Sequence, residues 1–252
     1  PRVLGPIRPY HCHVAGVTLT VKGLAWQQQD TAVATCATVA LWEMLHSAAF
    51  DEYHAITTTA AITKSAHKSI SFGRRMFPSS GLPIYQIMEA VKEHNLAPVP
   101  LDGNVKNSNG VVVGFTAKRF ASTFANLVRS KYAVLIIGEL VDLGSHAVVG
   151  IGYRQRETPI EENPTLQDSN TKYLYIHDDN LGPNVRFEIG TTKKPINGNC
   201  RRKSEEIVIL RPSPPADSKD TASNGGSLLN NYEFVPRHMI VAVHNELRTS
   251  PD

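Results

Sequence analysis

The sequence predicts an α+β fold in which a mainly helical first half packs on an antiparallel sheet formed by the second half. Hydrophobic residues recur at spacings of three and four at 36–45, 84–94 and 117–131, which is typical of amphipathic helices. After residue 131 the pattern changes to short apolar runs, as expected for strands buried on both faces. Helices followed by strands favour an antiparallel sheet over a wound parallel one.

The whole chain, residues 1–252, is expected to form a single domain, because 41% hydrophobic content supplies one sizeable core. We divide it into a lead-in strand region at 1–23, a mainly helical part at 24–131 and a mainly β part at 132–252. An insertion at about 212–231 is rich in Ser, Asp, Pro, Gly and Asn, and we expect it to be flexible.

In the first half, residues 1–13 contain three prolines and predict an irregular lead-in, while the Val- and Thr-rich stretch 14–21 predicts a strand. Pro83 suits the first turn of the helix at 84–94. The other segments predicted here are a helix at 56–69, a loop at 71–80, a helix end at 95–98 and a short strand at 111–115. In the second half the predicted strands lie at 132–137, 146–153, 173–177, 185–189, 207–210 and 239–243.

Composition narrows the function classes. The net charge of +3 is small and its Lys and Arg are scattered, so we expect no nucleic-acid partner. Three cysteines, an odd and low number, disfavour a disulfide framework and favour a reducing compartment. Without an apolar run of about 18 residues or a visible signal peptide, we expect no membrane span and a cytoplasmic location. His11, Cys12 and His13 lack further ligands at metal-like spacing, so we expect neither metal nor cofactor.

Cys36 has a position in the sequence that favours a reactive thiol. Cys36 follows a polar run that includes Gln28 and Gln29, and it opens the apolar helix. Unpaired backbone N–H groups and the helix dipole favour negative charge at that end, and therefore the nucleophilic thiolate. The alternative is that Cys36 is a small, inert core residue.

A thiol nucleophile needs a base, and the base needs an orienting group. His146 enters a buried strand after a Gly-Ser turn, and imidazole is a suitable base near neutral pH. Asp178 and Asp179 leave the next predicted strand, where either carboxylate could orient the imidazole. As alternatives, the histidine is an ordinary core residue and the aspartates form a turn.

This chain order resembles the papain-like cysteine peptidase superfamily. Residues 144–153 are similar to the histidine strand of that family, and 173–178 to the strand that carries its catalytic Asn, with Asp here, as in the bacteriocin-leader-processing branch. Residues 81–96 also resemble the helical segment that follows the nucleophile helix in the family. The resemblance covers roughly residues 24–185 and implies a papain-like fold, with the nucleophile helix packed on the sheet.

The resemblance implies roles for individual residues. Cys36 would be the nucleophile, His146 the base and Asp178 the orienting acid, because the strand alignment selects Asp178 whereas alignment from Gly182 selects Asp179. The family's oxyanion glutamine stands six residues before the cysteine, where this chain has Asp30. Gln29 and Gln28 therefore both remain candidates.

The expected function is a thiol-dependent hydrolase that cleaves a peptide, isopeptide or amide bond of a protein or peptide substrate through an acyl-enzyme on Cys36. The alternatives are a transglutaminase-like or deamidating acyl transferase, and a catalytically idle binding module with the same fold. The sequence does not determine the substrate or the oligomeric state.

Overall fold

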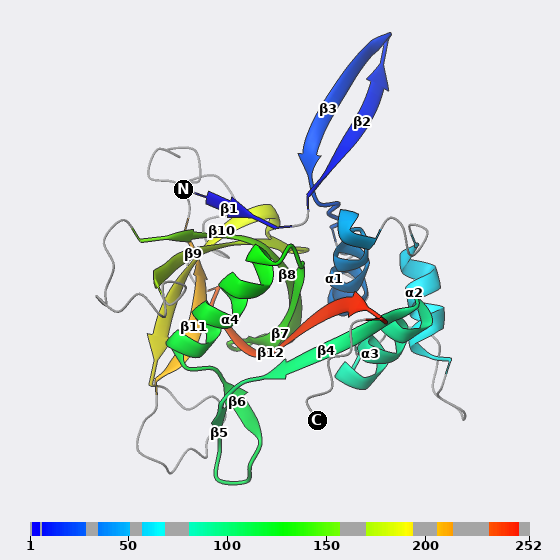
Figure 1. Ribbon diagram of the computed structural model, residues 1–252. Helices are drawn as coiled ribbons and strands as arrows, with labels where there is room; N and C mark the ends of the chain where they lie inside the picture. Colours follow the sequence, from blue (N-terminus) through cyan, green and yellow to red (C-terminus); the bar gives the residue numbers. More distant parts are fainter. Residues whose placement is uncertain are drawn as a thin grey trace.

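The computed structural model describes residues 2–5, 7–28, 35–50, 57–68, 81–156, 170–193, 206–213 and 232–246 (Figure 1). Strands account for 48% and helices for 25% of it. No helix in these ranges combines the length and the apolar character needed to span a membrane.

An eight-stranded antiparallel sheet forms the centre of the molecule (Figure 1). Six of its strands close into a ring in the order β8-β7-β12-β11-β10-β9, because β8 pairs with both β7 and β9. These strands are β7 (Val134–Leu140), β8 (Gly144–Gln155), β9 (Thr171–Asp178), β10 (Gly182–Thr192), β11 (Ile207–Pro212) and β12 (Phe234–His244). Outside the ring, β1 (Arg2–Leu4) pairs with β8 and β4 (Leu96–Asp102) pairs with β12.

The prediction of a papain-like α+β fold, with a helical lobe packed on a sheet, is therefore wrong. Strands outnumber helices, at 48% against 25% of the described chain, and the sheet closes on itself. The part expected to be mainly helical also contains β4, which includes most of the helix end predicted at 95–98. Pro98 and Pro100 argue against a central strand, but β4 is an edge strand that pairs with β12 alone, and an edge strand tolerates proline.

The described chain contains four α-helices: α1 (Cys36–Leu45), α2 (Thr59–Ala66), α3 (Ile84–Glu93) and α4 (Ala117–Arg129). The helices α1, α3 and α4 pack on the sheet, whereas α2 packs on α1 and α3. A short 3-10 helix, Ala48–Phe50, follows α1. The side chains of the strands alternate between two cores. Leu135 of β7 packs with α1, α2 and α3 in one core, whereas Val134 and Ile136 pack with α4 in the other.

Gly150 of β8 lets α4 approach the sheet closely. A Cβ atom at this position would overlap the ring of Phe124 on α4. The glycine in an otherwise apolar strand is thus explained by packing, and it lets the aromatic face of α4 rest directly on the strand.

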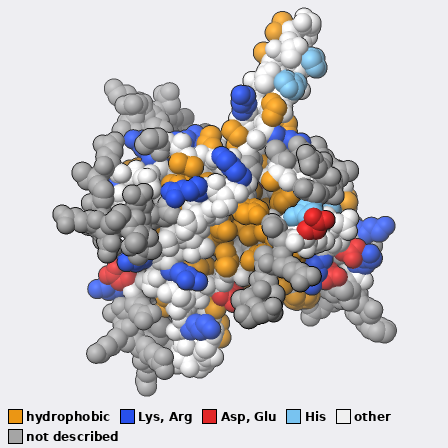
Figure 2. All heavy atoms as spheres, in the orientation of Figure 1, with side chains coloured by type: hydrophobic (Ala, Val, Ile, Leu, Met, Phe, Trp, Pro, Cys, Tyr) orange, Lys and Arg blue, Asp and Glu red, His pale blue; other side chains and the backbone are white. Residues whose placement is uncertain are grey.

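The lead-in is more regular than predicted. Residues expected to be irregular form β2 (Arg8–Val14), which pairs with β3 (Val17–Gly23) in a projecting two-stranded arm (Figure 1). His11 and His13 bond Thr20 and Thr18 across one face of the arm. The other face is apolar (Figure 2): Cys12, Val14, Val17, Leu19 and Val21 are exposed there, and Tyr10 is half-buried.

The other element predictions agree with the structure in position. The helices expected at 56–69, 84–94 and 117–131 are α2, α3 and α4, and the strands expected after residue 131 are β7 to β12. The strand expected at 111–115 is β6 (Val112–Gly114), which pairs with β5 (Val105–Lys106). The expected loop at 71–80 and residues 214–231 of the expected flexible insertion lie outside the described ranges.

Candidate functional site

Three segments that are far apart in sequence meet where α1 packs on the ring. Cys36 is the first residue of α1, His146 lies on β8, and Asp178 is the last residue of β9. β8 and β9 are paired, with Val149 opposite His177, which sets the end of β9 beside the start of β8. The closed sheet thus brings the predicted nucleophile, base and acid to one place.

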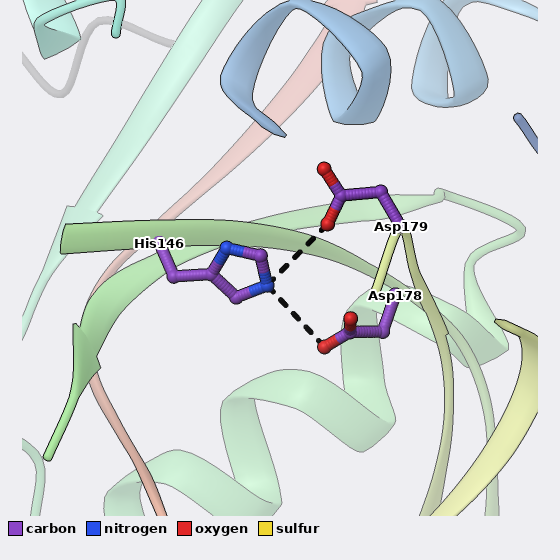
Figure 3. A group of neighbouring side chains, drawn as sticks. All are labelled: His146, Asp178 and Asp179. Atoms are coloured by element: carbon purple, nitrogen blue, oxygen red, sulfur yellow. Dashed lines mark hydrogen bonds and ion pairs between the residues drawn. The ribbon is translucent and has the colours of Figure 1, made fainter. Parts of the chain in front are cut away.

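His146 is the centre of the group. It is buried, and its Nε2 atom lies 3.3 Å from Oδ2 of Asp178 (Figure 3). Burial alone would lower the pKa of His146. Side-chain hydrogen bonds with Asp178 and Cys36 and the negative charges of both groups outweigh burial and raise this pKa to about 10. Its two partners therefore favour the protonated form of the ring.

Asp178 is held rigidly. Its Oδ1 accepts hydrogen bonds from the backbone N–H groups of Asn180, at 2.8 Å, and Leu181, at 3.1 Å. Its Oδ2 accepts a hydrogen bond from the Tyr232 hydroxyl. Burial would raise the pKa of Asp178, but the hydrogen bond and charge of His146, with these donors, hold it below its usual value. Asp178 is therefore a fixed carboxylate that orients the imidazole.

Asp179 reaches the same ring nitrogen from the other side (Figure 3). Its Oδ1 lies 3.6 Å from Nε2 of His146, too far for a hydrogen bond. Only 4% of the residue is exposed, and neither carboxylate oxygen has a hydrogen-bond partner within the described chain. Burial raises the pKa of Asp179 to about 6, although the charge of His146 opposes the rise. Of the two aspartates left open by the sequence, Asp178 has the geometry of an orienting acid.

Glu43 is a member of this site that sequence reasoning missed. It lies two turns after Cys36 on α1, is 1% exposed, and accepts a hydrogen bond from the Gln27 backbone N–H at 3.2 Å. Burial raises its pKa to about 9; the Gln27 hydrogen bond opposes this rise, and the charges of Asp179 and Asp178 add to it. A glutamate on the apolar face that also carries Cys36 was the available signal.

Tyr232 was also missed, and no pattern in the sequence marks it. It follows the polar insertion and is buried against Asp178. Its ring and that of Phe234 meet the His146 ring edge-on, with centroids 6.5 and 6.0 Å away. These aromatic rings pack against the imidazole and help to keep it buried.

The structure describes only one of the two glutamines that were candidates for the oxyanion donor. Gln28 is exposed, and Gln29 lies outside the described residues. The segment before them is anchored at the site, because the Trp26 indole donates to the Asp178 carbonyl at 3.1 Å and the Gln27 N–H donates to Glu43. Cys12 lies exposed on the arm, and Cys200 is outside the described chain.

The group also contains metal-binding atoms. One atom each of His146, Asp178 and Asp179 lies within 4.8 Å of the other two, a set of donors that can hold a divalent cation. The prediction of no metal rests on the spacing of His11, Cys12 and His13 and does not take the donors around His146 into account. Comparison of the chain with protein-family models and with curated proteins finds no match. A function for the chain is therefore inferred from this geometry alone.

Proposed function

We propose that this chain is a thiol-dependent hydrolase that cleaves a peptide, isopeptide or amide bond through an acyl-enzyme on Cys36. The observation that carries the proposal is the chain of contacts from Cys36 through His146 to Asp178. It joins a thiol at a helix N-terminus, an imidazole and a buried carboxylate in the order that nucleophilic catalysis requires. The same constellation occurs on unrelated folds, so the proposal does not need a papain-like fold.

In this reaction the Cys36 sulfur attacks the substrate carbonyl carbon, and the imidazolium of His146 gives its proton to the leaving amine. The product is a thioester on Cys36 and a free amine. Water then attacks the thioester, His146 accepts its proton, and the acid is released as the thiolate re-forms. Asp178 holds the ring in position and balances its charge through both steps.

The tetrahedral intermediate carries a negative oxygen that needs donors. The first turn of α1 offers backbone N–H groups, since Val39 is the first of its residues to donate within the helix, to the carbonyl of Thr35. Gln28 or Gln29 would add a side-chain amide. The hydrogen bonds of Trp26 to Asp178 and of Gln27 to Glu43 support this role, because they fix the segment that leads to these glutamines.

The test is cleavage of a mixed peptide library, with the fragments identified by mass spectrometry. Wild type should form new termini, Cys36→Ala should form none, and the matched variant Cys12→Ala should behave as wild type, because Cys12 lies on the projecting arm. An added primary amine separates hydrolysis from acyl transfer, since transfer would incorporate the amine. Equal cleavage by wild type and Cys36→Ala would refute the proposal.

A further inference from the structure

The proposed hydrolase gives no role to the buried carboxylate of Asp179. Asp178 alone orients His146, yet the carboxylate of Asp179 points at the same nitrogen with a side chain only 2% exposed. Neither of its oxygens has a hydrogen-bond partner in the described chain. An unsatisfied buried carboxylate is costly, and such a group in a folded protein calls for a bound ion, a water or a functional role.

The spacing of the three donors fits a small cation. Zn²⁺ binds imidazole nitrogen and carboxylate oxygen at about 2.0–2.2 Å in tetrahedral geometry, which places neighbouring donor atoms roughly 3.3 Å apart. Here Nε2 of His146 is 3.3 Å from Oδ2 of Asp178 and 3.6 Å from Oδ1 of Asp179 (Figure 3). A cation between them would need only small shifts to reach all three atoms.

The donor types and their support indicate which cation. One nitrogen and two carboxylate oxygens suit Zn²⁺, whereas Mg²⁺ and Ca²⁺ prefer a larger set of oxygen ligands. Backbone N–H groups of Asn180 and Leu181 and the Tyr232 hydroxyl already hold Asp178, as outer groups do around metal ligands. Two carboxylates also balance the charge of a divalent ion.

We propose that His146, Asp178 and Asp179 bind one Zn²⁺ ion, which replaces the proton on Nε2 of His146 and switches off the thiol chemistry. With zinc on one ring nitrogen and a proton on the other, the neutral imidazole has no position left to accept a proton from a thiol or from water. The inhibition rests on the proposed function, but binding of the ion does not.

Binding is tested on the full chain, stripped of metal and titrated with Zn²⁺ against a coloured chelator. His11 and His13 lie on one face of the arm and could chelate zinc themselves, so all variants carry His11→Ala and His13→Ala. In that background Asp179→Asn should lower the zinc affinity at least tenfold. The matched control is Asp102→Asn, which removes another His–Asp contact, at 2.8 Å to His238, and should leave the affinity unchanged.

A spectroscopic readout separates the site from a folding defect. Co²⁺ in place of Zn²⁺ should give the intense visible bands of a tetrahedral complex, and Asp179→Asn should lose them while keeping the circular dichroism of the parent. Equal zinc affinity in the parent and in Asp179→Asn would overturn the proposal, as would octahedral Co²⁺ spectra.

The two proposals fail in different ways. Zinc should slow alkylation of Cys36 by iodoacetamide in the parent and have less effect in Asp179→Asn. If zinc binds through Asp179 but Cys36 shows no peptide cleavage, the hydrolase is wrong and the metal site stands. If cleavage depends on Cys36 but zinc neither binds through Asp179 nor slows alkylation, the metal site is wrong and the hydrolase stands.

Discussion

Replacing Glu43 with Gln should stabilise the protein, and by an amount that depends on pH. Glu43 is buried beside two aspartates, and its pKa is raised from 4.5 to about 9. The folded chain therefore keeps a proton on this group at neutral pH that the unfolded chain loses. Glutamine has nearly the shape of the protonated acid, and its amide oxygen can still accept from the Gln27 N–H.

The size of the effect follows from proton linkage. Between the two pKa values the folded state binds more protons than the unfolded state, so the contribution of Glu43 to stability falls as pH rises. Each pH unit changes the free energy of unfolding by about 1.4 kcal/mol, so at pH 7 the penalty is about 3 kcal/mol. Glu43→Gln should therefore match wild type near pH 4.5 and exceed it by up to about 3 kcal/mol at pH 7.

The measurement is urea unfolding of both proteins at several pH values from 4.5 to 8. Glu246→Gln serves as the control, because that side chain is 91% exposed and its replacement should give no pH-dependent difference. A gap between Glu43→Gln and wild type that stays constant with pH, or a variant less stable than wild type at pH 7, would refute the reasoning.

Four further substitutions test the packing and the site by urea unfolding at pH 7. Gly150→Ala should cost about 1–3 kcal/mol, since the new Cβ overlaps the Phe124 ring, and an unchanged midpoint would contradict the close packing of α4. Leu135→Ala in the core should cost about 2–5 kcal/mol, whereas Leu19→Ala on the exposed arm should cost under about 0.5; similar losses would mean that the arm is packed. Tyr232→Phe should cost about 1–3 kcal/mol because it removes a donor to a buried carboxylate, and a neutral outcome would show that this hydrogen bond contributes little.

Local pattern was enough to place the helices and strands of the second half. In α4, Phe120 and Phe124 recur at helical spacing and are fully buried, so the helix could be read from the sequence. The apolar runs of β7 and β8 are buried on both faces, as their composition predicted. These signals depend only on residues that are close along the chain, so a single sequence is enough to detect them.

Closure of the sheet could not be predicted in this way. It depends on β8 having partners on both sides and on β12 pairing with β7 and β11, and apolar content carries no information about pairing. The residues of the candidate site also differ in how far the sequence predicts them. Cys36 and His146 could be chosen from residue type and local context. The charges of the aspartates near Glu43 and the hydrogen bond from Tyr232 to Asp178 arise only when distant segments meet.

The most direct test of the central claim is the rate at which each cysteine of the folded protein reacts with iodoacetamide at neutral pH, followed by mass spectrometry. Cys12 is exposed on the arm and Cys36 is only partly exposed, so accessibility alone would make Cys12 the faster of the two. The account predicts that Cys36 reacts faster than Cys12 and Cys200, and that His146→Gln removes this advantage while the protein stays folded. A Cys36 that reacts no faster than Cys12, or that keeps its rate without His146, would contradict it.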